Sequence, residues 1–175
     1  MQLLSNGYLP AQLTIRCAGE DDLAALEWDG EFAHFRHVFV EAYKQTQAGQ
    51  AKIWIAVIPE NHLIGQVLVS LNGARPELSN GVTRAYIYGF RVKPKYRNRG
   101  IGRLMMHTVE EDLLQAGFYI ATLNVAHTNP AARRFYERFG YSIVANEPGY
   151  WSYIDQYERR QDVCEPAWRM EKELS

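Results

Sequence analysis

Hydrophobic residues along the chain follow two different spacings, one typical of strands and the other of helices. Alternating or continuous apolar runs occur at residues 13–17, 53–58, 63–71, 85–92, 120–126, 141–145 and 168–174. Such runs, bounded by turn-forming residues, predict β-strands. The run Ile53–Ile58 is almost wholly apolar, which predicts a central strand buried on both of its faces.

Helices are predicted where hydrophobic residues recur at gaps of three and four. The first such stripe consists of Ile101, Leu104, Met105, Val109, Leu113 and Ala116. It ends before Gly117, and Leu104, Met105 and Met106 are all expected in the core. A second helix is expected from the capping pair Asn129-Pro130 to Gly140. An earlier helical region reaches to about residue 48, with a break near residues 28–30.

The order of these elements indicates an α/β chain of the α+β type, with a strand–helix–strand–helix–strand unit in its second half. No internal repeat, low-complexity run or linker divides the 175 residues. We therefore expect an N-terminal lead-in over residues 1–10 and one domain over residues 11–175.

Several classes of protein are disfavoured by the composition. The longest stretch without Asp, Glu, Lys or Arg, Asn61–Ala74, is too short to span a bilayer, so no membrane partner is expected. Residues 1–7 lack the cationic start of a signal peptide. Cys17 and Cys164 lie outside any CxxC motif, which is typical of reduced thiols in a cytoplasmic protein. One long-range disulfide is the alternative.

Positive charge is concentrated in one segment, although the whole chain has a formal charge of −1. Six of the nineteen Lys and Arg residues lie between Arg91 and Arg103, where there is no acid, and the other thirteen face twenty acids. This balance excludes a globally basic nucleic-acid binder. It predicts an acidic domain with a single cationic segment, suited to an anionic cofactor and a cationic acceptor.

This cationic segment follows a predicted strand and opens a predicted helix, with Gly100 and Gly102 at the junction. The first N–H groups of a helix lack internal partners, and glycines let an anion approach them. Arg97, Arg99 and Arg103 can add charge-assisted hydrogen bonds. The segment therefore predicts a cradle for phosphate or pyrophosphate.

Two common phosphate motifs are absent from the sequence. No GxxxxGK[ST] sequence occurs, and Met105 stands where the dinucleotide-binding pattern GxGxxG requires its third glycine. Two alternatives to a nucleotide cradle remain. One is a tight turn whose arginines face water, and the other is a site for RNA phosphates, which lacks the usual interleaved aromatic residues.

Two segments resemble a known family. Arg97-Asn98-Arg99-Gly100-Ile101-Gly102 matches the R/Q-x-x-G-x-G/A signature of the GNAT-type, acetyl-CoA-dependent N-acetyltransferases. Residues 129–141, from Asn129 through Tyr136 to Tyr141, are similar to the family's N-x-x-A-x-x-x-Y-x-x-x-G-F/Y segment. The order of elements also fits, so the resemblance covers nearly the whole chain.

The resemblance implies a mixed, mostly antiparallel central sheet with helices on both faces. The strand ending at Val92 and the strand starting at Ile120 would splay apart and form a slot for acetyl-CoA. The backbone of Phe90, Arg91 and Val92 would pair with the pantetheine arm, and the N–H groups from Asn98 to Arg103 would hold the pyrophosphate. Asn129 would bind the pantetheine or cysteamine part.

The implied reaction is direct transfer of the acetyl group to a primary amine of a small molecule, peptide or protein. Tyr136 would act as the general acid that donates a proton to the departing thiolate. The base is open, because Asn124 stands where several family members carry Glu. His127, Tyr86 and Tyr88 are the polar candidates, with a water relay as an alternative. A non-catalytic acyl-CoA-binding module is the alternative to an enzyme.

Residues for the acceptor amine are expected at Tyr86 and Tyr88 and in two further segments. One, residues 27–31, contains Trp28 and Asp29, and the other, residues 150–155, contains Trp151. Acids and aromatic rings suit a cationic amine, although simple packing of Trp28 and Trp151 is the alternative. His34 and His37 lack a third ligand, so no metal is expected. A homodimer is common among similar proteins.

Overall fold

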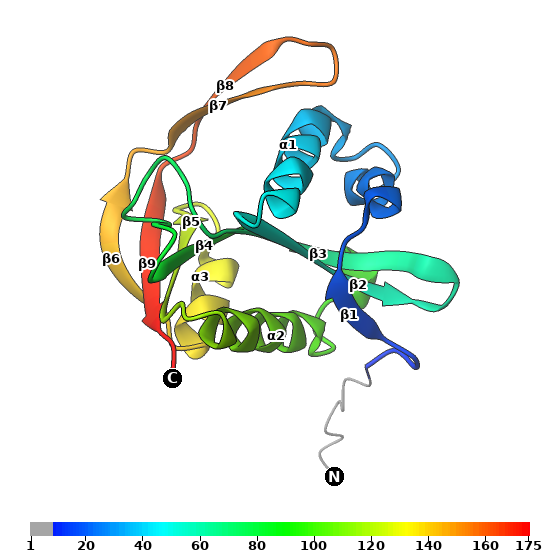
Figure 1. The fold of residues 1–175 in the computed structure, drawn as a ribbon, viewed down its shortest axis with the longest axis horizontal. Helices are drawn as coiled ribbons and strands as arrows, with labels where there is room; N and C mark the ends of the chain where they lie inside the picture. The colour runs from blue at the N-terminus through cyan, green and yellow to red at the C-terminus, as the bar shows by residue number, and fades with distance from the viewer. Residues whose placement is uncertain (1–8) are drawn as a thin grey trace.

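A seven-stranded sheet forms the centre of the computed structural model, which describes residues 9–175 (Figure 1). The order of its strands is β1-β2-β3-β4-β5-β9-β6. They are β1 (Thr14–Cys17), β2 (Ala51–Ile58), β3 (His62–Ser70), β4 (Arg84–Val92), β5 (Ile120–Ala126), β6 (Ser142–Glu147) and β9 (Ala167–Glu173). Only β4 and β5 pair in parallel, whereas the other neighbours are antiparallel. The predicted mixed, mostly antiparallel sheet is confirmed.

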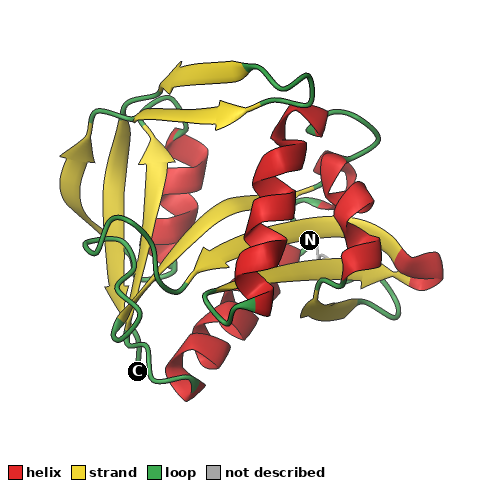
Figure 2. Cartoon of the chain, turned by 45° about the horizontal axis from the view of Figure 1, so that its top comes forward, coloured by secondary structure: helices red, strands yellow, loops and turns green. Residues whose placement is uncertain are grey.

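Helices cover both faces of this sheet (Figure 2), as predicted. The helical segments are η1 (Glu20–Glu27), η2 (Ala33–Phe35), α1 (Arg36–Gln47), η3 (Pro59–Asn61), η4 (Pro94–Tyr96), α2 (Ile101–Gln115) and α3 (Pro130–Arg138). Figure 1 shows α1 on one side of the sheet and α2 on the other. None of the helices within residues 9–175 combines the length and hydropathy needed to cross a membrane.

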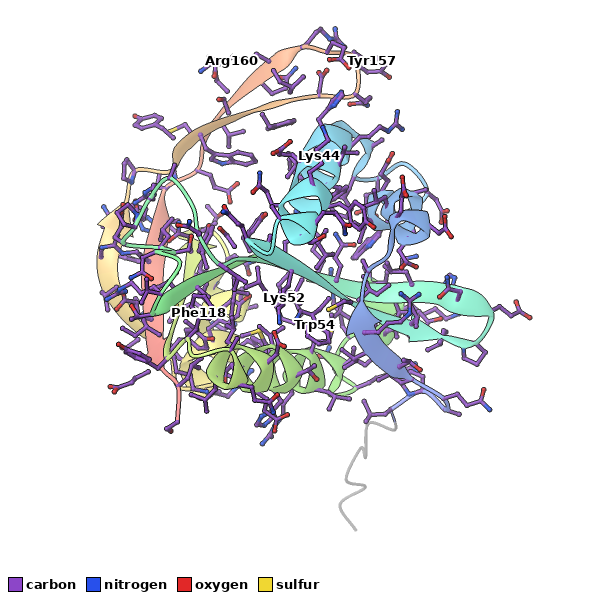
Figure 3. The ribbon with its side chains drawn as sticks, viewed as in Figure 1. Lys44, Lys52, Trp54, Phe118, Tyr157 and Arg160 are labelled. Atoms are coloured by element: carbon purple, nitrogen blue, oxygen red, sulfur yellow. The ribbon has the colours of Figure 1, made fainter. Side chains whose placement is uncertain are left out.

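Strand β2 explains why the sheet needs cover on both faces. Ile53 and Ile55 belong to the core beneath η1 and α1, whereas Trp54 and Ala56 pack into the core beneath α2 and α3. Figure 3 shows Trp54 and Lys52 between β2 and α2. Burying one such aliphatic side chain contributes roughly 1.5–3 kcal/mol, so both layers stabilise the sheet.

Two residues of the stripe predicted for α2 are not buried: Leu104 and Ala116, which is the exposed C-cap residue after the helix. Met105, Met106 and Val109 are fully buried, but Leu104 is 38% exposed. The expectation that Leu104 lies in the core is wrong, because successive residues of a helix are rotated by about 100° and Leu104 lies beyond the buried stripe. Gly117 follows the helix with a φ of +91°, as its position at the end of the stripe indicates.

The expected break in the first helical region is confirmed. Trp28, Asp29 and Gly30 have φ values of +49°, +56° and +104° and separate η1 from η2. The expected lead-in over residues 1–10 lies almost entirely outside the described residues. Cys17 and Cys164 are both free thiols, and both are exposed.

A separate hairpin, formed by β7 (Tyr150–Ile154) and β8 (Arg160–Cys164), arches over α1 (Figure 1). Tyr157 and Arg160 lie at its far end (Figure 3). At its base, the N–H of Glu165 donates to the carbonyl of Gly149 at 3.0 Å. Tyr153 packs on Phe35 with ring centroids 5.0 Å apart, which holds the hairpin against the helical layer.

We expect Gly149→Ala to destabilise the protein more than a left-handed backbone alone explains. Gly149 has a φ of +76°, and a Cβ there would lie 1.8 Å from the carbonyl oxygen of Glu165. The matched control is Gly49→Ala, because Gly49 has a φ of +74° and no atom within 4 Å of its Cβ position. The control should lose about 1–2 kcal/mol in urea unfolding, and equal losses in both variants would contradict the prediction.

Candidate active site

The parallel pairing of β4 with β5 stops half-way along β4. It runs from Arg84 opposite Ile120 to Ile87 opposite Leu123, and no later residues of the two strands pair. Strand β4 continues to Val92 and β5 to Ala126, each still paired to its other neighbour. The predicted splay is therefore confirmed, and backbone groups along 88–92 on the β5 side have no strand partner within the described residues.

An irregularity in β4 turns its side chains at the same place. Leu68 pairs with Tyr88 and Gln66 pairs with Arg91, so β4 has one extra residue over this step. Gly89 lies within it and has a φ of +58°. As a consequence of this bulge, Phe90 packs against the α2 side of the sheet, whereas Arg91 lies over rings on the α1 side.

Helix α2 begins at the end of this open strand with several free N–H groups. The first N–H with a backbone partner is that of Leu104, which donates to Gly100 at 3.0 Å. Within residues 9–175, no hydrogen bond joins the N–H groups of residues 98–103 to the protein. Gly100, with a φ of +84°, sets the turn that leaves these donors pointing outward.

The two glycines of this turn have different physical roles. A Cβ on Gly100 would meet only Leu9, at 3.9 Å, so the positive φ explains the glycine. A Cβ on Gly102 would lie 3.4 Å from Phe90 and 3.7 Å from Phe135. Gly102 therefore lets the first turn of α2 pack closely on those two rings.

The six basic residues of residues 91–103 do not form one cluster. Arg97 donates from Nε to the carbonyl of Val92 at 2.7 Å, which braces the end of β4. Arg99 lies near the ring of Tyr96 at 5.9 Å. A basic hollow of about 290 Å³ between α2 and α3 is lined by Arg103, His107, Phe135, Arg138, Phe139 and Lys172. Arg91 points to the opposite face of the sheet from this hollow.

Tyr136 lies at the wall of the splayed region. Its ring is 9% exposed and lies 6.5 Å from the ring of Phe90. Its hydroxyl has no hydrogen bond within the described part of the chain. Burial raises the pKa of Tyr136 far above the ordinary tyrosine value, with a smaller contribution from Tyr86. Tyr136 is therefore a protonated, uncommitted donor at neutral pH.

Tyr86 and Tyr88 stack on each other on the α1 face of β4. Their centroids are 5.4 Å apart and their planes are within 8°. Burial raises the pKa of Tyr88 to about 12, helped by Tyr86, and burial also raises the pKa of Tyr86. Asn124, the first residue of β5 beyond the paired segment, places Nδ2 3.5 Å from the Tyr86 hydroxyl. Its Oδ1 is buried without a partner among the described residues.

Asn129 and His127 lie just beyond β5. Asn129 caps α3, because its side-chain oxygen accepts from the N–H of Ala132 at 3.1 Å. Its Nδ2 has no partner within residues 9–175 and remains available as a donor. His127 is exposed, with its ring 4.1 Å from that of Trp168 on the α3 side of the sheet. The structure does not bring His127 together with Tyr86 and Tyr88.

Besides Tyr86 and Tyr88, the residues predicted for the acceptor are Trp28, Asp29 and Trp151, which lie in different environments. Trp28 is only 6% exposed, and its Nε1 donates to Oε1 of Gln66 at 2.9 Å. Asp29 is exposed in the break after η1. Trp151, on β7, is 46% exposed and stacks on Phe35 at 6.1 Å. Trp28 thus packs in the core, and Trp151 covers the aromatic layer from above.

Several polar residues of this face escaped the sequence analysis. Gln66 is a fully buried amide inside the apolar strand β3, and that contrast was a usable signal. Glu147 is also buried, and accepts hydrogen bonds from Arg75 at 2.8 Å and Arg169 at 3.3 Å. Glu147, Arg75 and Arg169 are far apart in sequence, so no local pattern marks this group.

A model of the acetyltransferase (GNAT) family matches residues 20–141. The chain belongs to the GNAT family. It is therefore an acyltransferase, and members of this family typically act on acetyl-CoA and an acceptor substrate. The resemblance of its two sequence segments to GNAT enzymes is confirmed by this match.

Solved structures of GNAT enzymes have the same fold. The ribosomal-protein-S18-alanine N-acetyltransferase of Escherichia coli is 18% identical, with a TM-score of 0.70 over 94% of this chain and 95% of that one. Spermidine/spermine N-acetyltransferase SpeG of Vibrio cholerae is 17% identical, with a TM-score of 0.68 over 94% of each chain. Arabidopsis thaliana NAA60, solved with a bisubstrate analogue, is 20% identical, with a TM-score of 0.68 over 93% and 98%.

Stability is expected to fall with rising pH above about pH 10 because of Tyr88. Its pKa is about 12 in the fold and 10.0 as the ordinary value, so the unfolded chain releases the proton first. The free energy of unfolding then decreases between pH 10 and 12, by on the order of 2 kcal/mol from this residue. Tyr88→Phe should show a shallower decrease in urea titrations.

The control for this titration is Tyr157→Phe, since Tyr157 is 66% exposed at the hairpin tip. It should follow the wild-type pH dependence. Identical slopes for wild type and Tyr88→Phe would show that burial of Tyr88 has no effect on alkaline stability.

Proposed function

We propose that this enzyme transfers the acetyl group of acetyl-CoA to a primary amine by direct attack of the amine on the thioester. The observation that carries the proposal is the continuity of two unsatisfied surfaces. The open edge of β4, up to Val92, leads directly to the free N–H groups at the start of α2. An extended chain that ends in a pyrophosphate satisfies both surfaces.

The residues present fit acetyl-CoA in chemical type along this line. Backbone groups of Phe90–Val92 would pair with the amides of the pantetheine arm. The N–H groups of Asn98–Arg103, together with the Arg97, Arg99 and Arg103 side chains, would hold the pyrophosphate. The free Nδ2 of Asn129 would donate to a carbonyl of the arm.

Tyr136 is proposed as the general acid. Acetyl-CoA supplies an activated acetyl group and a thiolate leaving group. The raised pKa of Tyr136 keeps its proton in place at neutral pH, and its hydroxyl has no competing acceptor among the described residues. When the amine nitrogen bonds to the acetyl carbon and the carbon–sulfur bond breaks, Tyr136 donates its proton to sulfur.

Neither β4 nor β5 carries a carboxylate that could act as a base in the splayed segment. Asn124 cannot accept a proton at neutral pH, and its unpartnered Oδ1 is instead suited to receive a hydrogen bond from the amine or from a water molecule. Burial keeps Tyr86 and Tyr88 neutral. We therefore propose loss of the amine proton through water, in preference to His127, which lies against Trp168.

A non-catalytic acyl-CoA-binding module is the second candidate. The amide at Asn124, in a strand position where a carboxylate would be a base, favours it. The uncommitted hydroxyl of Tyr136 favours the enzyme, because binding alone does not require a buried hydroxyl that lacks a partner among the described residues. Measurement of CoA release with a panel of amines separates the two candidates.

We expect a negative charge at Gly100 to weaken acetyl-CoA binding by about tenfold or more, because the charge would face the pyrophosphate. Gly100→Asp and Gly100→Asn form a matched pair. Both residues tolerate the φ of +84°, and they differ only in charge. Calorimetric affinities that are equal in the two variants would argue against the pyrophosphate cradle.

Tyr136→Phe should lower kcat about a hundredfold while it leaves the affinity for acetyl-CoA within roughly twofold. The ring still fills the wall beside Phe90, and only the proton donor is lost. Steady-state kinetics and calorimetry together test this split. An unchanged kcat in the variant would remove Tyr136 from the chemistry.

A further inference from the structure

Arg91 is a cation without an ionic partner on the α1 face of the sheet. Its guanidinium carbon lies 4.3 Å from the ring centroid of Phe32 and 5.5 Å from that of Phe35. Within residues 9–175 it has no hydrogen bond and no ion pair. Desolvation by burial lowers the pKa of Arg91, yet an arginine remains charged at neutral pH. A partly buried, unpaired charge is costly, which points to a missing anion.

Gln66 is a second unsatisfied donor beside Arg91. The two residues are directly opposite each other in the β3–β4 register, so their side chains lie on the same face. Gln66 is fully buried, and its amide orientation is fixed because Trp28 Nε1 can only donate and therefore meets Oε1. The amide nitrogen Nε2 is left without a partner among the described residues.

The aromatic residues join these two donors into one site. Trp28, the hydrogen-bond donor to Gln66, packs edge-on against Phe32 with ring centroids 5.0 Å apart. The guanidinium of Arg91 lies over the Phe32 ring. Gly89 lies next to this site, since a Cβ there would be in ordinary contact with Nη1 of Arg91, at 3.8 Å. The two donors therefore lie beside the bulge, where β4 has already parted from β5.

The charges around this site do not neutralise Arg91. The charge of Glu31 acts on Arg91, but Glu31 is exposed and forms no ion pair with it. Lys93 adds a second cation, 5.8 Å from the ring of Trp28. The buried acid Glu147 is already paired with Arg75 and Arg169. A carboxylate bound here would thus interact with Arg91 and Gln66, which have donors without partners among the described residues, and with the positive charge of Lys93 nearby.

We infer that Arg91 and Gln66 bind the carboxylate of a free amino acid whose amine is the acetyl acceptor. A guanidinium over a ring face directs its N–H groups within its own plane, which matches the two oxygens of a carboxylate. The inference rests on the proposed acetyl transfer and assigns its acceptor class. It replaces the cationic amine that the acids and aromatic residues of the sequence suggested, because Arg91 itself occupies the aromatic rings.

The test compares three acceptor mixtures with acetyl-CoA: the common amino acids, the corresponding amino-acid amides, and polyamines. Release of CoA is followed with a thiol reagent. Wild type should acetylate the amino acids with a kcat/KM at least about tenfold above that of the amides. Arg91→Gln should lose this preference through an increase in KM for the acids. A wild-type enzyme that uses the amides or polyamines equally well overturns the inference.

Gln66→Glu provides an independent variant if Arg91→Gln does not fold. It keeps an oxygen acceptor for Trp28 Nε1 and replaces the free Nε2 with a negative oxygen opposite Arg91. The variant should lose the amino acids as acceptors and retain the amides. Unchanged use of the amino acids contradicts the inference. Arg160→Gln, a 70% exposed arginine of β8, is the charge-matched control and should retain the wild-type preference.

Thermal unfolding separates a binding role from a structural one. Arg91→Gln should change the melting temperature little, because removal of the unpaired charge offsets the loss of the contacts with the Phe32 and Phe35 rings. If Arg91→Gln has a lower melting temperature but still prefers amino acids over their amides, Arg91 has a structural role and not a binding one. Calorimetry with acetyl-CoA distinguishes the two levels of the proposal. If the enzyme binds acetyl-CoA and acetylates amides or polyamines but not amino acids, only the proposed acceptor class is refuted. If it neither binds acetyl-CoA nor acetylates any amine, the proposed acetyl transfer is refuted.

Discussion

Hydrogen bonding between β4 and β5 ends at Ile87 and Leu123, and the two strands then separate although both remain in the same sheet. Exposed strand edges are normally a liability, because their N–H and C=O groups pair with other chains. Here the parting strands lie in the middle of a sheet that has helices on both of its faces (Figure 2). The packing of α2 against Phe90, through Gly102, and of α3 along β5 keeps this opening in shape.

The two faces of β4 serve different parts of the proposed reaction. On the α2 side, unsatisfied N–H groups and three arginines favour a phosphate-bearing group. On the α1 side, Arg91 and Gln66 offer donors within an aromatic layer that Trp151 and Tyr153 of the hairpin close. The concentrated positive charge seen in the sequence is thus divided between the two faces, which a count of charges along the chain does not reveal.

Much of the fold could be predicted from the sequence, because its elements have strong local signals. The alternation in β5, the cap at Asn129 and the glycines after α2 and α3 depend on neighbouring residues only. The chemistry of the acceptor side could not be predicted in this way. The direction of Arg91 depends on one extra residue in β4, and the isolation of Gln66 depends on Trp28, which is 38 residues away. Leu104 was assigned to the core because neighbouring positions of a helical stripe were treated as equivalent.

The bulge at Gly89 links the two proposed binding regions, because its extra residue decides which face of the sheet each later side chain of β4 lies on. If one residue of the bulge were deleted, every later side chain of the strand would exchange faces. The Phe90 ring would leave its contact with α2, and a different residue would enter the aromatic layer in place of Arg91. With the proposed sites, substitution at these positions would alter the acceptor alone, whereas a change in strand length here would disturb both proposed binding regions at once.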